Sequence, residues 1–429
     1  MKYSPIDPHL FVENRKRLAA KLLPNSLAIL NANDVPPTNA DGTTRFRQNS
    51  DLFYLSGIDQ EETVLALFPD CRNEKHREIL FVRRTDDLIA VWEGARLTED
   101  QARERSGIAA IHWLDSFPRM LRELMIEAKH VYLNTNEHLR ATTEVESRDQ
   151  RFLRRCMTEY PLHRYERLAP LLHELRPVKS SVELDLIREA CRITGQAFRR
   201  ILGFVRPGVT EYEIEAELIH EFVRNRATGF AYLPIIASGA GSCVLHYIEN
   251  DQTCRDGDLL LLDVGAEYAN YAADLTRTLP VNGRFSDRQR DVYQAVLRIQ
   301  RQAISLLRPG TRLKSYQEEV ASIVEEELIR LKLFSRADVE AQDSAHPLYK
   351  RYFMHGTAHH LGLDVHDVSV PARPLEPGMV MTCEPGIYIR EENLGVRLEN
   401  DILITEDGNL DLMADIPIEP GEIEDLMQG

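Results

Sequence analysis

The chain has 429 residues, of which 43% are hydrophobic and 28% are charged, and its formal net charge is −16. This length favours two domains, and the acidity argues against a nucleic-acid or anionic-membrane partner, because both attract basic surfaces. The sequence contains no run of about 18 apolar residues, so we expect no membrane span. The six cysteines form no CxxC pair and the N-terminus lacks an apolar signal segment, which together predict reduced thiols and a cytoplasmic location.

The first part of the chain alternates short apolar runs with helical patterns. Strands are predicted at 26–30, 63–68, 77–84 and 130–134, and helices at 11–23 and 117–128. Such alternation indicates an α/β domain with a mostly parallel or mixed sheet. No GxGxxG or GxxxxGK[ST] motif follows any of these strands, so we expect no nucleotide site there.

A domain boundary is predicted near Pro177. The segment "RPVKSSVEL" places a proline and two serines before an acidic residue and an apolar-periodic run, which is the pattern of a helix start. We therefore expect an N-terminal domain at 1–176 and a second domain at 177–429.

The second part contains a weak internal repeat. A helical run, then Arg-Pro-Gly, then an acidic helix occurs once around Arg206–Gly208 and again around Arg308–Gly310, and each copy is followed by strand-like segments. One copy would be an ordinary helix end, but two with the same flanks predict a duplicated helix-and-strand half-domain.

Two acidic residues flank a predicted hairpin in "LLLLDVGAEYANYAADLTRT". If the chain reverses at Tyr268–Ala269, Asp263 faces Asp274, and directly opposed residues have Cβ atoms about 5 Å apart. A surface hairpin with solvated aspartates is the usual alternative, but the leucine run before Asp263 argues against it. Carboxylates this close in an apolar strand repel each other unless a cation lies between them.

A second hairpin is predicted in "MVMTCEPGIYIREENLGVRLEND", where a reversal at Glu391–Glu392 places Glu384 opposite Glu399. Gly395 could instead mark a bulge that would change this register. Two such hairpins in one domain would bring four carboxylates together.

A histidine-rich segment lies between the two hairpins in the sequence and contains His355, His359, His360 and His366. No HExxH or GxSxG motif is present, which excludes a single-zinc protease helix and an esterase-type serine. Carboxylates with a histidine favour two hard or borderline divalent cations such as Mn²⁺, about 3.5–4 Å apart, that activate a bridging water for hydrolysis.

With these residues identified, the sequence resembles the pita-bread metallopeptidases, and most closely the Xaa-Pro aminopeptidases (aminopeptidase P) among them. The matching blocks are "DGTTRFRQNSDLFYLSGI", "LLLDVGAEYANYAADLTRTLPVNGRFSDRQRDVY", "MHGTAHHLGLDVHD", "CEPGIYI" and "GVRLENDILIT", in order and spacing over nearly the whole chain. The implied fold is an N-terminal α/β domain followed by a pita-bread domain with a pseudo-twofold repeat. Asn270 stands where this family usually has a turn glycine, and Asn tolerates left-handed angles.

The resemblance also implies roles for individual residues. The metal ligands would be Asp263, Asp274, His359, Glu384 and Glu399. The catalytic residues would be Glu384 as proton shuttle, with His246 and His366 on the scissile carbonyl. The substrate-binding residues would be Tyr232, His355, Tyr388, Arg397 and Asp41. His360 is interpreted as a packing residue.

The activity implied is removal of an N-terminal residue that precedes proline in a peptide, with two divalent metal ions per subunit, Mn²⁺ being expected. Prolidase, which cleaves only dipeptides, shares the metal ligands and stays an alternative, as does an inactive peptide-binding scaffold. The resemblance further implies a homodimer or homotetramer, in which the N-terminal domain narrows access to the site. Trp92 is a candidate to reach a neighbouring subunit, unless it is a core residue.

Overall fold

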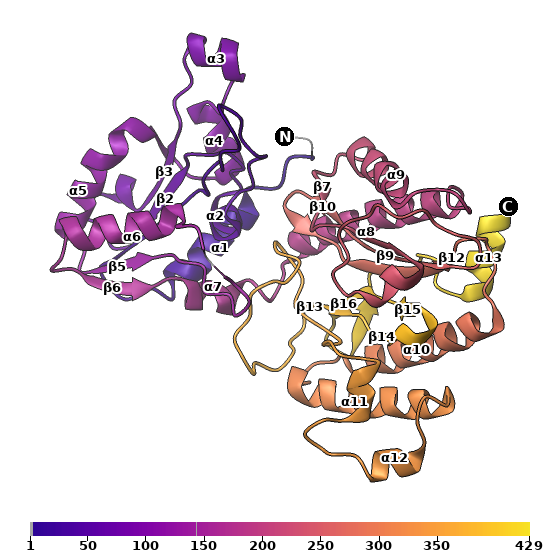
Figure 1. Ribbon diagram of the computed structural model, residues 1–429. Helices are drawn as coiled ribbons and strands as arrows, with labels where there is room; N and C mark the ends of the chain where they lie inside the picture. The colour runs from indigo at the N-terminus through magenta and orange to yellow at the C-terminus, as the bar shows by residue number, and fades with distance from the viewer. Residues whose placement is uncertain (1–2, 143) are drawn as a thin grey trace. The chain divides into compact units, whose positions relative to one another are not determined.

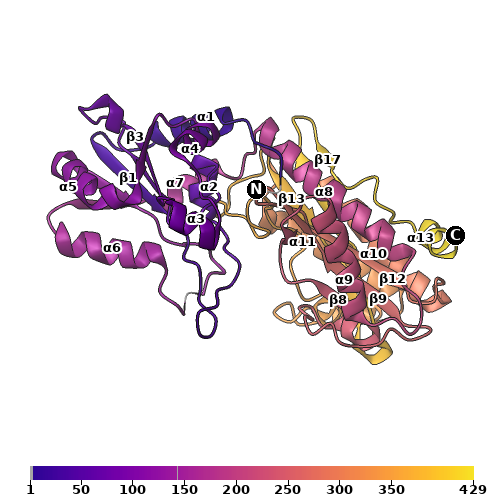
Figure 2. The same ribbon diagram turned by 90° about the horizontal axis from the view of Figure 1, so that it is seen from above.

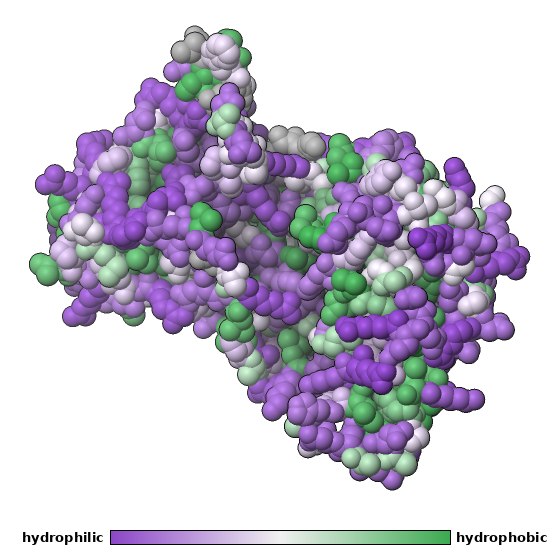
Figure 3. Space-filling model, in the orientation of Figure 1, coloured by the Kyte–Doolittle hydropathy of each residue, from purple (hydrophilic) through white to green (hydrophobic). Residues whose placement is uncertain are grey.

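The computed structural model describes residues 3–142 and 144–429, and the chain divides into two compact units, Tyr3–Arg176 and Pro177–Gly429. The two units are shown in Figure 1 and, turned by 90°, in Figure 2. On the face drawn in Figure 3 the surface is mostly hydrophilic, with scattered hydrophobic patches. Among the described residues, no helix is both long and apolar enough to cross a membrane.

The first unit is built on a six-stranded sheet of order β4-β3-β2-β1-β5-β6. Its strands are β1 (Ser26–Asn31), β2 (Val64–Leu67), β3 (Glu78–Val82), β4 (Ala110–Trp113), β5 (His130–Leu133) and β6 (Arg164–Arg167). Its helices are α1 (His9–Ala19), α2 (Ser50–Ser56), α3 (Asp87–Glu93), α4 (Glu99–Ser106), α5 (Phe117–Glu127), α6 (Arg148–Glu159) and α7 (Ala169–Leu175). β2 is antiparallel to both β1 and β3, and the other pairs are parallel, so the sheet is mixed as predicted.

The second unit contains two helix pairs with strands between them (Figure 1). Its helices are α8 (Ser181–Leu202), α9 (Glu211–Arg224), α10 (Asp287–Leu306), α11 (Leu313–Arg330), α12 (Arg336–Glu340) and α13 (Pro420–Gln428). Its strands are β7 (Gly229–Phe230), β8 (Ile235–Ser238), β9 (Leu259–Val264), β10 (Ala266–Tyr268), β11 (Tyr271–Ala272), β12 (Leu275–Pro280), β13 (Val380–Cys383), β14 (Gly386–Ile389), β15 (Leu394–Arg397), β16 (Asn400–Ile404) and β17 (Asn409–Asp411). Helix α8 contacts β10 and β11, α9 contacts β7 and β8, and α10 contacts β13, β14 and β15.

The predicted repeat corresponds to these helix pairs. α8 packs on α9 and α10 packs on α11, and an Arg-Pro-Gly turn joins each pair. Gly208 has φ of 94° and Gly310 has φ of 86°, angles that favour glycine because it has no Cβ. The same turn chemistry therefore connects the helices in both halves of the unit.

The first acidic hairpin has a register different from the predicted one. Thr276, not Asp274, lies opposite Asp263, and the chain reverses at Ala269–Asn270, whose φ angles are 52° and 66°. The predicted reversal at Tyr268–Ala269 was wrong because Asn270 takes the second left-handed position of the turn. Asp274 is two residues from Thr276, and since side chains alternate with period two, it still points to the same face as Asp263.

The second acidic hairpin has the predicted register. Gly386 pairs with Arg397 on the side of the hairpin tip, and Cys383 pairs with Asn400 on the other side. Glu384 and Glu399 therefore occupy opposed positions between these two pairs. Gly395 pairs with Tyr388 and forms no bulge. An added Cβ at Gly395 would lie 2.1 Å from the Ser242 carbonyl oxygen, so glycine is needed there for close approach of two backbone segments.

Candidate metal centre

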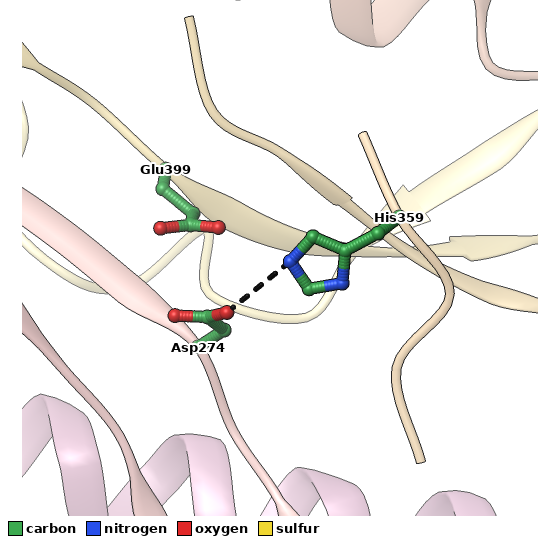
Figure 4. Close-up of side chains that lie close together, drawn as sticks. All are labelled: Asp274, His359 and Glu399. Atoms are coloured by element: carbon green, nitrogen blue, oxygen red, sulfur yellow. Dashed lines mark ion pairs between the residues drawn. The ribbon is translucent and has the colours of Figure 1, made fainter. Parts of the chain in front are cut away.

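The acidic residues of both hairpins converge with His359 in the second unit. One ligand atom from each of Asp274, His359 and Glu399 lies within 4.8 Å of the others (Figure 4). The His359 Nε2 atom lies 3.5 Å from Asp274 Oδ2 and 3.7 Å from Glu384 Oε1. Asp263 joins the group through Tyr232, whose hydroxyl lies 2.7 Å from Asp263 Oδ1 and 2.5 Å from Asp274 Oδ1.

Hydrogen bonds from the backbone hold these side chains in place. Asp274 donates its N–H to the buried carboxylate of Asp401 at 3.1 Å, and Glu399 donates its N–H to the Thr276 carbonyl at 3.0 Å. Glu384 donates its N–H to the Thr357 carbonyl at 2.8 Å. The backbone N–H groups of Asp274, Glu384 and Glu399 are thus each fixed by an acceptor from a distant segment.

The tautomer of His359 suits metal binding. Its Nδ1 atom lies 3.0 Å from the His360 carbonyl oxygen, which can only accept a hydrogen bond, so Nδ1 carries the proton. In the neutral ring this tautomer directs the Nε2 lone pair towards Asp274 and Glu384, the arrangement common to histidine ligands.

The charged forms of these carboxylates are energetically unfavourable because the side chains are buried close to one another. Burial, reinforced by the Asp263 charge, raises the pKa of Asp274 well above its usual value. Burial and the Asp274 carboxylate likewise raise the pKa of Glu399, and burial raises that of Glu384 to about 7. Glu399 Oε1 is buried with no hydrogen-bond partner. This set of oxygen atoms fits divalent cations, which would supply the missing positive charge.

Arg397, Tyr388 and His355 form a hydrogen-bonded chain that leads to Asp263. The Arg397 Nη2 atom donates to Asp263 Oδ2 at 2.5 Å, and its Nη1 atom donates to the Tyr388 hydroxyl at 2.8 Å. That hydroxyl lies 2.8 Å from His355 Nε2, and burial lowers the pKa of His355 to about 4. Tyr388 is completely buried and Arg397 is 3% exposed, so His355 is the member of this chain nearest to solvent.

The remaining predicted residues lie in different places. The His366 ring centroid is 4.4 Å from that of His359, nearly perpendicular to it, so His366 belongs to the same cluster. His246 follows the 3-10 turn Gly239–Cys243 and is exposed. Asp41 and Trp92 belong to the first unit, where both are exposed. Trp92 is 81% exposed, so it is not a core residue.

Sequence reasoning missed several residues that support the ligands. The Thr276 hydroxyl donates to Glu399 Oε2 at 2.7 Å, and the fully buried Arg277 donates to the Glu399 carbonyl at 2.8 Å. Asp401 also accepts a hydrogen bond from the Cys191 thiol at 3.4 Å. An arginine in β12, a buried strand paired with the leucine run of β9, was the visible signal, because a buried guanidinium must have fixed acceptors.

The fold and this site define a metallopeptidase. Residues 185–406 match the model of metallopeptidase family M24, and residues 11–132 match that of the aminopeptidase P N-terminal domain. The chain belongs to metallopeptidase family M24.

Named relatives are similar over nearly the full chain. The Xaa-Pro aminopeptidase of Escherichia coli is 38% identical over 99% of this chain and 98% of its own length. Human Xaa-Pro aminopeptidase 3 is 32% identical over 92% of this chain and 78% of its own. Among solved structures, Pseudomonas aeruginosa aminopeptidase PepP has a TM-score of 0.90 at 34% identity, covering 99% of this chain and 98% of its own. Zinc-substituted Escherichia coli aminopeptidase P in complex with product has a TM-score of 0.88 at 36% identity, covering 99% of both chains.

Proposed function

We propose that the protein is a metal-dependent Xaa-Pro aminopeptidase, which hydrolyses the bond between an N-terminal residue and a following proline. The observation that carries this proposal is the convergence of buried, mutually repelling carboxylates on the Nε2 atom of His359. The relatives named above support the choice of peptides with proline in second position as substrates.

Five residues are proposed to hold two divalent cations, with Mn²⁺ as the expected ion: Asp263, Asp274, His359, Glu384 and Glu399. When bound, the cations supply Lewis acidity at the scissile carbonyl. Asp274 and Glu399 would be the ligands that serve both ions, because Asp274 faces His359 and lies beside Asp263, while Glu399 Oε1 has no hydrogen-bond partner among the described residues.

Glu384 is proposed to move the proton. Its carboxylate is half-buried between His355 and His359, with 3.7 Å from Oε2 to His355 Nδ1 and from Oε1 to His359 Nε2. From this position it would take a proton from the attacking water and deliver it to the proline nitrogen as the peptide bond breaks.

His246 and His366 are proposed to donate hydrogen bonds to the scissile carbonyl as negative charge develops on its oxygen. His366 contacts the His359 ring, and His246 is exposed, which suits contact with an incoming peptide. We propose that Tyr232 and His355 contact the proline of the substrate. Tyr388 and Arg397 would orient His355 through the hydrogen bonds that connect the three residues.

The N-terminal domain, 1–176, is proposed to restrict access and to take part in a homodimer or homotetramer, with 177–429 as the catalytic domain. Asp41 would face the substrate, and the exposed Trp92 would contact a neighbouring subunit. Light scattering tests this: the full chain should be oligomeric, and Trp92→Ala should shift it towards monomer. A cytoplasmic location is also proposed, supported by six buried, unpaired cysteines.

The decisive assay compares an Xaa-Pro dipeptide with Xaa-Pro-Xaa peptides at matched Mn²⁺, Zn²⁺ and chelator conditions. The proposal expects cleavage of the longer peptides after their first residue, abolished by chelator and restored most fully by Mn²⁺. Cleavage of the dipeptide alone would indicate a prolidase. Metal uptake without hydrolysis, or no metal uptake at all, would indicate a peptide-binding scaffold.

A further inference from the structure

A buried ion pair lies next to His366 in the sequence and includes none of the proposed metal-binding or substrate-binding residues. Lys179 Nζ contacts Asp367 Oδ2 at 3.2 Å, and both side chains are 1% exposed. Asp367 is the residue after His366, and Lys179 is the third residue of the second unit. The pair therefore links the start of this unit to a segment 188 residues later.

The segment around Asp367 is a closed loop that begins at the metal-ligand segment. Asp367 donates its N–H to the His360 carbonyl at 2.8 Å, and its Oδ1 atom accepts from the Val368 N–H at 3.0 Å. The intervening Gly362 carbonyl accepts from the Ala272 N–H at 2.8 Å, next to the tip of the first hairpin. The orientation of Asp367 thus sets how the loop returns from His359 and His360 to His366.

Lys179 is itself fixed. Its backbone N–H donates to the Gly378 carbonyl at 2.9 Å. The preceding residue, Val178, forms a β-bridge with Met379, and the following residue, Ser180, is the N-cap of α8. A Cβ at Gly362 would lie 2.2 Å from Asp367 Oδ2 and 2.9 Å from Lys179 Cε. The ion pair therefore fills its space so closely that only glycine fits beside it.

We propose that Lys179 is a positioning residue for His366, acting through Asp367. This inference rests on the proposed function, because His366 is assigned there to the scissile carbonyl. The Lys179 ammonium holds the Asp367 carboxylate, and the Asp367 backbone N–H closes the loop on the His360 carbonyl. The closed loop then places the His366 ring against that of His359.

A buried ion pair in general adds little net stability to a fold. Replacement of both charges by neutral groups of similar shape often leaves stability unchanged, whereas removal of one leaves a buried charge without a partner. What the pair adds is a defined geometry: a salt bridge between two rigid backbones allows fewer arrangements than an apolar contact.

The test uses the full chain carrying Lys179→Met with Asp367→Asn, so that no charge is left unpaired. We expect kcat on an Xaa-Pro-Xaa peptide to fall about 10²-fold, as a small misplacement of a catalytic group can cost, while KM changes less than about threefold. Bound metal should equal that of the wild type, and a crystal structure should show the His366 ring displaced from His359. Gly362→Ala, which pushes on the pair without altering charge, should lower kcat in the same way.

The matched control is Arg298→Met with Glu327→Gln, which removes the ion pair between α10 and α11 in the same unit and also the contact of Glu327 with Arg330. It should leave kcat and metal content as in the wild type. Wild-type kcat in the Lys179 and Asp367 double variant, or in Gly362→Ala if the double variant does not fold, would overturn the inference. So would a loss of kcat that follows loss of metal. If the wild type itself hydrolyses no Xaa-Pro peptide, the proposed function fails, and an unmoved His366 ring in the variant structure would separately refute the role of Lys179.

Discussion

The buried carboxylates of the two acidic hairpins differ in the groups that compensate their negative charge. In the first, Asp263 accepts from Arg397 and lies with Asp274 around the Tyr232 hydroxyl. In the second, Glu399 has one oxygen bonded to Thr276 and one without a hydrogen-bond partner among the described residues. The Glu384 carboxylate lies 3.7 Å from the ring nitrogens of His355 and His359.

The contrast indicates where the structure most needs added positive charge. The first hairpin's carboxylates contact the Arg397 guanidinium, which comes from β15, and the Tyr232 hydroxyl, so the protein compensates part of their charge. The second hairpin keeps an unpartnered buried oxygen, for which a metal ion is the natural partner. Changes to the two hairpins should therefore differ in how strongly they affect activity and metal binding.

The largest effect is expected for Asp274→Asn. A bridging carboxylate serves two cations, so its loss should abolish activity and weaken the binding of both ions. Metal analysis of the purified variant gives the stoichiometry. Retention of two ions at wild-type affinity would contradict the bridging role.

Glu384→Gln should lose turnover while keeping substrate binding. The amide oxygen can still coordinate a cation, but it cannot transfer a proton, and this transfer typically contributes about 10²–10⁴-fold. Measured kcat should fall by that range with KM nearly unchanged. A kcat close to that of the wild type would remove Glu384 from the proton-transfer role.

Stability of the metal-free protein should decrease with rising pH above about 6.5. The folded pKa of Glu384 is raised from 4.5 to about 7, so its stabilising contribution is complete below pH 4.5 and is lost as the pH rises through 7. His355 and His360, with pKa values lowered to about 4 and about 3, act oppositely, but only below 6.5. Tm should therefore fall between about pH 6.5 and 8, and Mn²⁺ should restore it most at the upper end. A Tm that rises across this window without metal would contradict the argument.

The smallest effect is expected for Tyr232→Phe, which removes the donor shared by Asp263 and Asp274. Because Arg397 still pairs with Asp263, metal affinity should weaken by only about 10–100-fold, as is usual for groups that orient a ligand. Isothermal titration with Mn²⁺ measures this change. Unchanged affinity would show that Arg397, and not Tyr232, is the group that compensates the carboxylate charge of the first hairpin.

The sequence alone was sufficient where a residue's neighbours along the chain decide its structure. The apolar runs of β1, β2, β3 and β5, the Arg-Pro-Gly turns and the register of the second hairpin were all predicted, because periodicity and turn composition are local properties. The four-residue strands β4 (Ala110–Trp113) and β6 (Arg164–Arg167) were not predicted. β6 is polar, and both strands depend on pairing with a neighbouring strand, β3 or β5.

Only the tertiary structure decided the details of the candidate centre. The first hairpin's register depends on two consecutive left-handed residues at Ala269 and Asn270, and alanine gives no sign of that angle in a sequence. The contacts of Arg397 with Asp263 and of Lys179 with Asp367 join residues 134 and 188 positions apart. The sequence by itself determined which chemical groups the site contains, because residue type fixes their donors and charges. Their partners and burial were determined by packing between distant segments, which no local pattern records.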